Sequence, residues 1–201
     1  YDAAMKHAFF DQLHIPEPDV DLEVGSGTHA QQTADIMKRF EPVLDEVPPL
    51  AVLVVGDVNS TIACALVAVK KNIPVIHVEA GLRSGDRTMP EEINRILTDQ
   101  LSDLLFITEA SALANLTREG IAADKVHFVG NVMIDTLRYN LSDAVPSRSV
   151  LAKLTGSKVS DAGGDYGLVT LHRPSNVDDA IVLARLLNVL GEISRRIPLL
   201  F

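Results

Sequence analysis

The amino-acid sequence predicts an α/β protein with a doubly wound parallel sheet. Short apolar runs rich in Val, Ile and Leu alternate with longer segments of helical periodicity almost throughout the chain. This alternation is typical of βαβ units, in which helices connect parallel strands. The chain has 201 residues, of which 47% are apolar, and this is enough to bury a substantial core.

Each expected element follows from its local pattern. Short apolar runs bounded by Gly, Pro, Asn or Asp predict strands at residues 20–24, 50–55, 74–78, 104–108, 126–129, 167–171 and 198–201. Segments whose apolar residues recur every three or four positions predict helices at residues 31–46, 60–71, 91–103, 110–119, 133–140 and 178–195.

The alternation stops between Ser142 and Asp165. This polar stretch contains Pro146 and three glycines, and its one short helical piece is SVLAKL. Such a composition is typical of a boundary between domains. We therefore expect a first domain at residues 1–145, a linker at 146–165 and the beginning of a second domain at 166–201. The opening strand of the first domain and most of the second are expected to lie outside this chain.

Charge and cysteine content exclude several classes of function. The net charge of −9 and the isoelectric point near 5.0 oppose binding to nucleic acid, which needs clustered Lys and Arg. The single cysteine, Cys64, permits no internal disulfide and is expected to be a packed core thiol. We see no apolar run long enough for a membrane span and no signal peptide, so a cytoplasmic protein without membrane partners is expected.

Three carboxylates follow the expected strands. Asp57 comes directly after the run at 50–55, and Glu79 and Glu91 lie in the segment HVEAGLRSGDRTMPEEINR. In open parallel sheets, ligands bind outside the carboxyl ends of the strands. Three acids at that edge predict proton-transfer chemistry, whereas no metal-ligand spacing is present.

Six segments, in order, carry a resemblance to a known family: GSGTHAQQT, VVGDVNST, HVEAGLRS, PEEINR, VGNVMIDTL and VTLHRPSNVDD. On these segments the chain resembles the non-hydrolysing UDP-N-acetylglucosamine 2-epimerases. The resemblance implies a GT-B-type architecture of two Rossmann-like domains with the nucleotide sugar between them, of which this chain would hold an internal part. A homodimer is expected. We also expect that these 201 residues alone do not catalyse the reaction of the family.

The resemblance also implies a reaction and the residues for it. The family inverts C2 of the sugar by eliminating UDP to a 2-acetamidoglucal and adding it back from the other face, without NAD or metal. A base and an acid must therefore act on opposite faces of C2. By resemblance, Asp57, Glu79 and Glu91 match the acidic catalytic trio, and His172 matches the histidine of the second domain.

Further residues are expected to bind the UDP-sugar substrate. His172 with Arg173 would neutralise the departing diphosphate, and Asn176 lies in the same motif. Arg83 and Arg95 are expected to orient the acids or the glycan, because a guanidinium stays protonated. The position of Gln32 contacts a second, regulatory substrate molecule in part of the family; a solvated helix start is the equal alternative.

Other interpretations stay open at this point. Asp57 could belong to a helix N-cap cluster, and Glu91 could be an acid in a first helical turn after Pro90. Rival activities are a hydrolysing 2-epimerase and an enzyme acting on a 2,3-diacetamido uronate, against which Leu82 argues modestly. A metallophosphoesterase is disfavoured by Val132, and a non-catalytic nucleotide-sugar-binding paralogue is the non-enzyme alternative. Gly85 and Ser175 depart from the family pattern.

Overall fold

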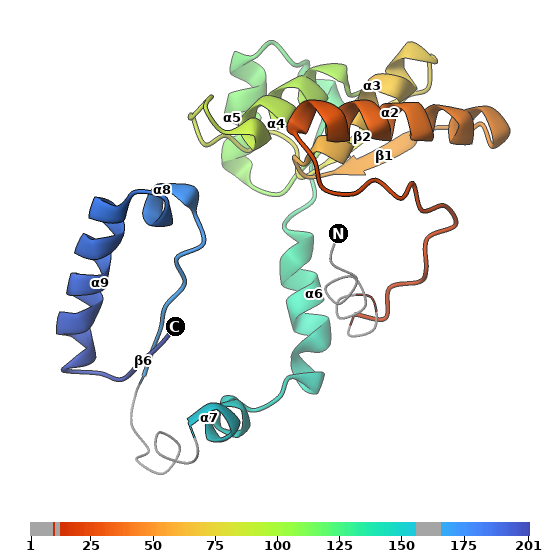
Figure 1. The fold of residues 1–201 in the computed structure, drawn as a ribbon. Helices are drawn as coiled ribbons and strands as arrows, with labels where there is room; N and C mark the ends of the chain where they lie inside the picture. Colours follow the sequence, from red (N-terminus) through yellow and green to blue (C-terminus); the bar gives the residue numbers. More distant parts are fainter. Residues whose placement is uncertain (1–9, 11–12, 156–165) are drawn as a thin grey trace. The chain divides into compact units, whose positions relative to one another are not determined.

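A computed structural model describes residue 10, residues 13–155 and residues 166–201 (Figure 1). The chain divides into two compact units, Tyr1–Leu141 and Ser142–Phe201. In the parts of the chain that are described, no helix is both long and apolar enough to cross a membrane.

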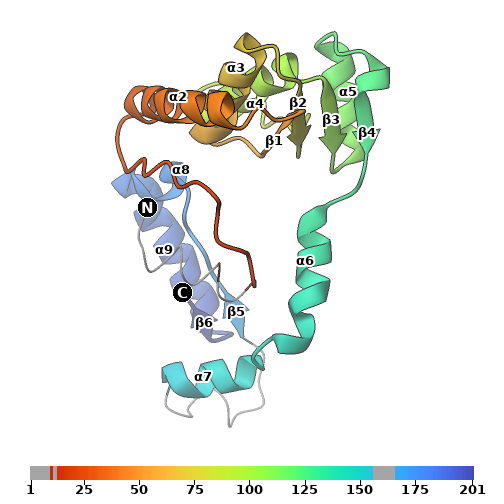
Figure 2. The same ribbon diagram turned by 90° about the vertical axis from the view of Figure 1, so that its right-hand side faces the viewer.

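The first unit is built on a parallel sheet of four strands, seen side by side in Figure 2. The strands are β1 (Val52–Val55), β2 (Val75–Val78), β3 (Leu104–Ile107) and β4 (Val126–Phe128), in the spatial order β1-β2-β3-β4. Every neighbouring pair is parallel. The predicted α/β fold with a parallel sheet is therefore confirmed. Because the strand order is consecutive, these four strands correspond to one half of a doubly wound sheet.

The helices of this unit are α2 (His29–Glu46), α3 (Asn59–Lys70), α4 (Pro90–Leu101), α5 (Ala110–Arg118) and α6 (Val132–Asn140), with short 3₁₀ turns η1 (Ala123–Lys125) and, leading into the second unit, η2 (Leu141–Asp143). α3 packs against α2, α4 and β1, and one buried cluster of apolar side chains lies there. A second cluster surrounds Leu105 and Leu116, between β3 and α5. The first cluster also includes side chains of β1, β2 and α4, whereas the second holds the turn after β2 through Ala80.

The strand predicted at residues 20–24 is wrong. These residues run without strand pairing, and the guanidinium of Arg39 on α2 donates hydrogen bonds to the carbonyl oxygens of Leu22 and Glu23 at 2.7 and 2.9 Å. Glu23 also has a φ of 52°, which interrupts an extended backbone. Leu22 and Val24 are half-buried and line a pocket, whereas Val20 is exposed, so the apolar alternation of this segment does not place it in the sheet.

Among its described residues, the second unit holds one βαβ arrangement. β5 (Gly167–Leu168) pairs in parallel with β6 (Leu199–Leu200), and α8 (Pro174–Val177) and α9 (Ala180–Ser194) lie between them in the sequence. Both strands are shorter than predicted, and α8 was not predicted. Asp179 caps α9 by accepting hydrogen bonds from the N–H groups of Ile181 and Val182.

The expected linker contains more helix than the sequence indicated. α7 spans Ser147–Thr155 within it, and linker residues 156–165 lie outside the described part. The boundary between the two compact units falls after Leu141, near the predicted domain boundary at residue 145. The assignment of whole domains stays a prediction.

Gly81 closes the turn that follows β2, and its replacement by alanine is expected to be strongly destabilising. Its φ is 76°, and an added Cβ would come within 2.9 Å of the side chains of Ala112 and Leu116. We expect Gly81→Ala to lower the free energy of unfolding by about 3 kcal/mol or more, from backbone strain plus overpacking.

Gly85 provides the matched control for this prediction. It has the same φ of 76°, but an added Cβ would meet nothing within 4 Å. Gly85→Ala should therefore cost only the strain of a left-handed residue, about 1–2 kcal/mol. Urea unfolding of both variants measures the difference, and equal losses would show that the predicted clash is relieved by repacking.

Candidate functional site

Two of the predicted acids lie at the carboxyl ends of adjacent strands. Asp57 follows β1 after Gly56, and Glu79 follows β2 directly. The last residues of the two strands, Val55 and Val78, are paired in the sheet. The register therefore places both carboxylates at the same edge of the first unit, as the sequence predicted.

Arg95, from α4, lies between the two acids. Its Nη2 is 2.8 Å from Oδ2 of Asp57 and 3.8 Å from Oε2 of Glu79. The Arg95 side chain is only 12% exposed, and in the described part of the chain its Nε is buried without a hydrogen-bond partner. One partly buried cation is thus shared by two carboxylates, with the closer contact to Asp57.

Glu79 adopts a conformation that non-glycine residues rarely take. Its φ is 69°, and its carboxylate lies over Gly56, where an added Cβ would be 3.3 Å from Oε2. The N–H groups of Glu79 and Ala80 both donate to the carbonyl oxygen of Phe106 on β3, at 3.0 and 3.2 Å. Such strained residues persist only where the surroundings fix them, and they gather at functional sites.

Asp57 does not cap a helix. The N-cap residue of α3 is Val58, and that cap has no side-chain hydrogen bond. The capping interpretation of Asp57 is therefore wrong, and its carboxylate is available to Arg95 and to a ligand.

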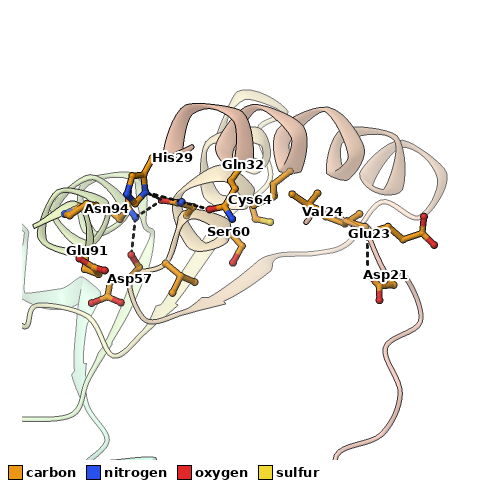
Figure 3. A pocket seen from close by; sticks show the side chains of 15 residues that line it. Asp21, Glu23, Val24, His29, Gln32, Asp57, Ser60, Cys64, Glu91 and Asn94 are labelled. Carbon is orange, nitrogen blue, oxygen red and sulfur yellow. Dashed lines mark hydrogen bonds between the residues drawn. The ribbon is translucent and has the colours of Figure 1, made fainter. Parts of the chain in front are cut away.

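Glu91 lies in the first turn of α4, after Pro90, and its side chain is exposed. It lines a pocket of about 330 Å³ together with Asp57. Figure 3 shows these two acids at one end of the pocket and Asp21 and Glu23 at the other. The pocket is also lined by Leu22, Val24, His29, Gln32, Ile36, Val58, Asn59, Ser60, Cys64, Pro90 and Asn94.

A network of amides forms one wall of this pocket (Figure 3). Asn59 donates to Oε1 of Gln32 at 2.9 Å and contacts Nδ1 of His29 at 3.1 Å. Asn94 donates to Asn59 Oδ1 at 3.2 Å and to the carbonyl oxygen of Asp57 at 2.9 Å. Gln32 is thereby tied into the pocket wall, and its contact with a second substrate molecule stays a prediction.

Cys64 also lines the pocket, in surroundings that disfavour its reactive form. Burial raises the pKa of its thiol to about 11, so the reactive thiolate is scarce near neutrality. No group of three or more His, Cys, Asp or Glu residues suited to hold a metal ion occurs among the described residues.

Arg83 makes its hydrogen bonds inside the protein. It donates to Asp99 at 2.7 Å, to both carboxylate oxygens of Glu119, and to the carbonyl oxygen of Leu82. Its side chain is only 9% exposed. A direct substrate contact by Arg83 would require these bonds to break, so the geometry favours an orienting role.

The remaining predicted residues belong to the second unit. His172 and Arg173 follow β5 and are exposed, and Nδ1 of His172 lies 3.2 Å from Thr170 Oγ1. Asn176 lies within α8. The structure thus brings Asp57, Glu79, Glu91, Arg95 and Gln32 together in one unit, and it places His172, Arg173 and Asn176 in the other.

Comparison with known proteins identifies the family. The sequence profile described as UDP-N-acetylglucosamine 2-epimerase matches residues 1–201. This chain belongs to the UDP-N-acetylglucosamine 2-epimerase family.

Individual members of the epimerase family show how far the likeness extends. The UDP-N-acetylglucosamine 2-epimerase of Methanocaldococcus jannaschii is 45% identical over 193 residues, covering 96% of this chain and 52% of the relative. A Pseudomonas aeruginosa relative, UDP-2,3-diacetamido-2,3-dideoxy-D-glucuronate 2-epimerase, is 43% identical over 196 residues, with 96% and 52% coverage. The chain spans about half the length of these curated relatives.

Solved structures agree with this assignment. The crystal structure of the M. jannaschii UDP-GlcNAc 2-epimerase in complex with UDP-GlcNAc and UDP matches with a TM-score of 0.81 at 40% identity, covering 95% of this chain and 52% of that one. The Neisseria meningitidis enzyme bound to UDP-GlcNAc matches with a TM-score of 0.79 at 29% identity, with 97% and 56% coverage.

Several residues around this epimerase-family site were not assigned a site role from the sequence. Asn59, Glu92 and Asn94 lie inside segments that carried the resemblance, but an amide or a second acid in a motif has no distinctive chemistry of its own. Asp99 lies in the middle of α4 and has no local signal at all. Their roles emerge only from the packing of α4 against the ends of β1 and β2.

Glu92 holds the loop between β2 and α4 and gives the protein a pH-dependent element of stability. It is 4% exposed and accepts hydrogen bonds from Ser84 N, Ser84 Oγ and Gly85 N at 2.8, 3.0 and 3.1 Å. Burial pushes the pKa of Glu92 upward, but these hydrogen bonds and the charge of Arg83 outweigh it. The pKa therefore lies below its ordinary value of 4.5.

A depressed pKa in the folded state stabilises the protein above the ordinary pKa of the carboxyl, and this stabilisation is lost as the pH falls through the folded-state pKa. We expect Glu92→Gln to cost about 1–2 kcal/mol at pH 7, the usual worth of a hydrogen bond to a charged group. Thermal unfolding from pH 7 to pH 3 measures the gap between wild type and variant. The gap should be constant above pH 5 and should shrink below 4.5; a gap that persists unchanged to pH 3 would contradict the assignment.

Proposed function

We propose that the whole protein interconverts UDP-N-acetylglucosamine and UDP-N-acetylmannosamine by eliminating UDP and adding it back. The observation that carries the proposal is the pair of strand-end acids, Asp57 and Glu79, which share Arg95. Membership of the epimerase family and the likeness to a structure complexed with UDP-GlcNAc support the same substrate.

The proposed chemistry proceeds in two steps. In the first, a carboxylate removes the proton from C2 while the bond from C1 to the UDP oxygen breaks, which leaves a C1–C2 double bond in 2-acetamidoglucal. In the second, the UDP oxygen bonds to C1 again and a proton is delivered to the opposite face of C2. Asp57, Glu79 and Glu91 supply the acid and base groups that two faces require. Arg95 orients two of them without exchanging protons itself.

The other site residues are proposed to hold the nucleotide. His172, Arg173 and Asn176 would contact the diphosphate and stabilise the charge that develops on it as it leaves. Gln32, fixed by Asn59 in the pocket wall, is proposed to contact a second, regulatory substrate molecule. No cofactor is required by this reaction, because the C2 proton and the UDP group account for all atoms exchanged.

We also propose that the whole protein works as a cytoplasmic homodimer. The family resemblance supports the dimer, and the acidic chain, with pI near 5.0, opposes nucleic acid as a partner. Sedimentation of the whole protein would measure the mass of the assembly.

A second candidate substrate is a UDP-2,3-diacetamido uronate. It is favoured by the P. aeruginosa relative, which is 43% identical to this chain, compared with 45% for the M. jannaschii enzyme. Leu82, whose place in the motif argues modestly against this candidate, packs against the apolar cluster between β3 and α5. Its effect on substrate choice would therefore act through the shape of the loop.

The test is incubation of the whole protein with each UDP-sugar, in the presence of a metal chelator and without NAD. Proton NMR of the UDP-N-acetylglucosamine sample is expected to show UDP-N-acetylmannosamine growing to an equilibrium mixture. Steady accumulation of UDP and free sugar would instead identify the hydrolysing activity. Inversion of the uronate alone would establish the second candidate.

A further inference from the structure

A buried pair of polar side chains, His77 and Asp99, lies beneath the two strand-end acids. Both side chains are completely buried. His77 is in β2, and Asp99 is in α4. Their contact joins Nδ1 of His77 to Oδ1 of Asp99 at 2.7 Å. A buried titratable pair is costly to desolvate, and the reaction proposed above does not use it for proton transfer.

The other polar atoms of this pair form hydrogen bonds with the two loops that carry Asp57 and Glu79. Nε2 of His77 donates to the carbonyl oxygen of Gly56 at 2.8 Å, directly before Asp57. Oδ2 of Asp99 accepts the N–H of Gly81 at 3.1 Å, two residues after Glu79. The chain from Gly56 through His77 and Asp99 to Gly81 therefore connects the end of β1 with the end of β2.

The two loops that this chain connects have unusual backbone conformations. Gly56, Glu79 and Gly81 all have left-handed backbones, with φ of 70°, 69° and 76°. For Glu79 that conformation is unfavourable by about 1–2 kcal/mol. The Phe106 carbonyl holds the loop from one side, and Asp99 holds the Gly81 amide from the other.

Arg83 fixes Asp99 in turn. Its Nη2 donates to the same Oδ2 that accepts the Gly81 N–H, at 2.7 Å, while Glu119 holds the other edge of the guanidinium. Both carboxylate oxygens of Asp99 are therefore engaged. A carboxylate fixed in this way can act as a rigid anchor for a strained loop.

We propose that His77 and Asp99 are positioning residues that set the separation and orientation of the Asp57 and Glu79 carboxylates. The proposal rests on the proposed function, because it assigns these two acids to the chemistry at C2. Neither His77 nor Asp99 touches the reacting atoms. Their loss should disturb proton transfer and leave nucleotide affinity unchanged, since a displacement of about 1 Å at a reacting group can cost about 10²-fold in rate.

The test compares three variants of the whole protein, assayed well below their melting temperatures. Asp99→Ala removes the anchor and is expected to lower kcat by about 10²-fold with KM changed by less than about threefold. Asp99→Asn is the rescue variant, because its oxygen can accept the Gly81 N–H and its amide can donate to His77. Its kcat should stay within about tenfold of wild type.

Asp103→Ala is the matched control. Asp103 accepts the N–H of Val75 at 3.0 Å, so it holds the opposite end of β2. Its loss should lower stability without changing kcat by more than about twofold. If Asp99→Ala does not fold, His77→Gln replaces it: glutamine can still donate to Gly56 but offers Asp99 no second ring nitrogen, and kcat should fall about tenfold at unchanged KM.

The outcomes separate the two proposals. A wild-type protein that does not epimerise overturns the proposed function whatever the variants do. A wild-type protein that turns over, with Asp99→Ala or its His77→Gln replacement losing no more kcat than Asp103→Ala, overturns the positioning role alone. A rise in KM with unchanged kcat would also overturn it.

Discussion

Changing Glu79 to glutamine in the whole protein is expected to lower the rate of epimerisation by about 10²-fold or more, the usual contribution of a general acid or base. Glutamine preserves the size of the side chain and its contact with the region over Gly56, but it cannot take up or release a proton. The backbone at Glu79 has a φ of 69°, a strained conformation that is common at functional sites and that is consistent with the proposed role of this carboxylate. Measuring both kcat and the melting temperature distinguishes a loss of catalysis from a loss of stability.

Glu109 offers a matched control for this substitution. It follows β3 by two residues, at the end of the next strand of the same sheet, but it is exposed and its side chain contacts Ser111. Glu109→Gln should leave kcat within about twofold of wild type. Asp57→Asn is expected to behave like Glu79→Gln, and near-normal turnover by both acid variants would remove these residues from the mechanism.

Replacing Arg95 with methionine is expected to have the second largest effect, about 10²-fold on kcat. Methionine fills the apolar part of the site but removes the cation that Asp57 and Glu79 share at 2.8 and 3.8 Å. Without it, two carboxylates at adjacent strand ends repel each other in a partly buried environment. Arg95→Lys keeps the charge without the planar fork and should lose less, about tenfold.

Arg118 is the control for the arginine variants. It lies in the last turn of α5 and is exposed, so Arg118→Met removes the same charge from a solvated position. Its kcat should not change measurably. A kcat for Arg95→Met equal to that of Arg118→Met would show that Arg95 is a packing residue.

The sequence predicted the fold well where periodicity and strand-end acids reinforce each other. The runs ending at Val55 and Val78 became adjacent parallel strands, and Asp57 and Glu79 lie beyond them as expected. The segment 20–24 shows the limit of such patterns. Its alternation resembles that of a strand. The guanidinium of Arg39, 16 or 17 residues away in the sequence, instead donates hydrogen bonds to the carbonyl oxygens of Leu22 and Glu23. No local pattern encodes that contact.

The neighbouring acids Glu91 and Glu92 show why site roles were harder to predict. The two side chains differ by one position on α4, which directs Glu91 outward and Glu92 into the loop at Ser84 and Gly85. Arg83 was expected to orient the acids or the glycan, and the partners that it contacts, Asp99 and Glu119, were not singled out from the sequence. A charged residue in a motif can serve the substrate or the fold, and only tertiary packing distinguishes the two.

The central claim is that C2 is inverted by exchange of its proton with protein carboxylates, and turnover in deuterated water tests it most directly. The whole protein, incubated with UDP-N-acetylglucosamine in D₂O, is expected to give UDP-N-acetylmannosamine that carries deuterium at C2, because a carboxyl that has exchanged with solvent delivers the new hydrogen. Mass spectrometry and the loss of the C2–H signal in proton NMR both report this label. Inverted product that retains its original hydrogen at C2 would contradict the account.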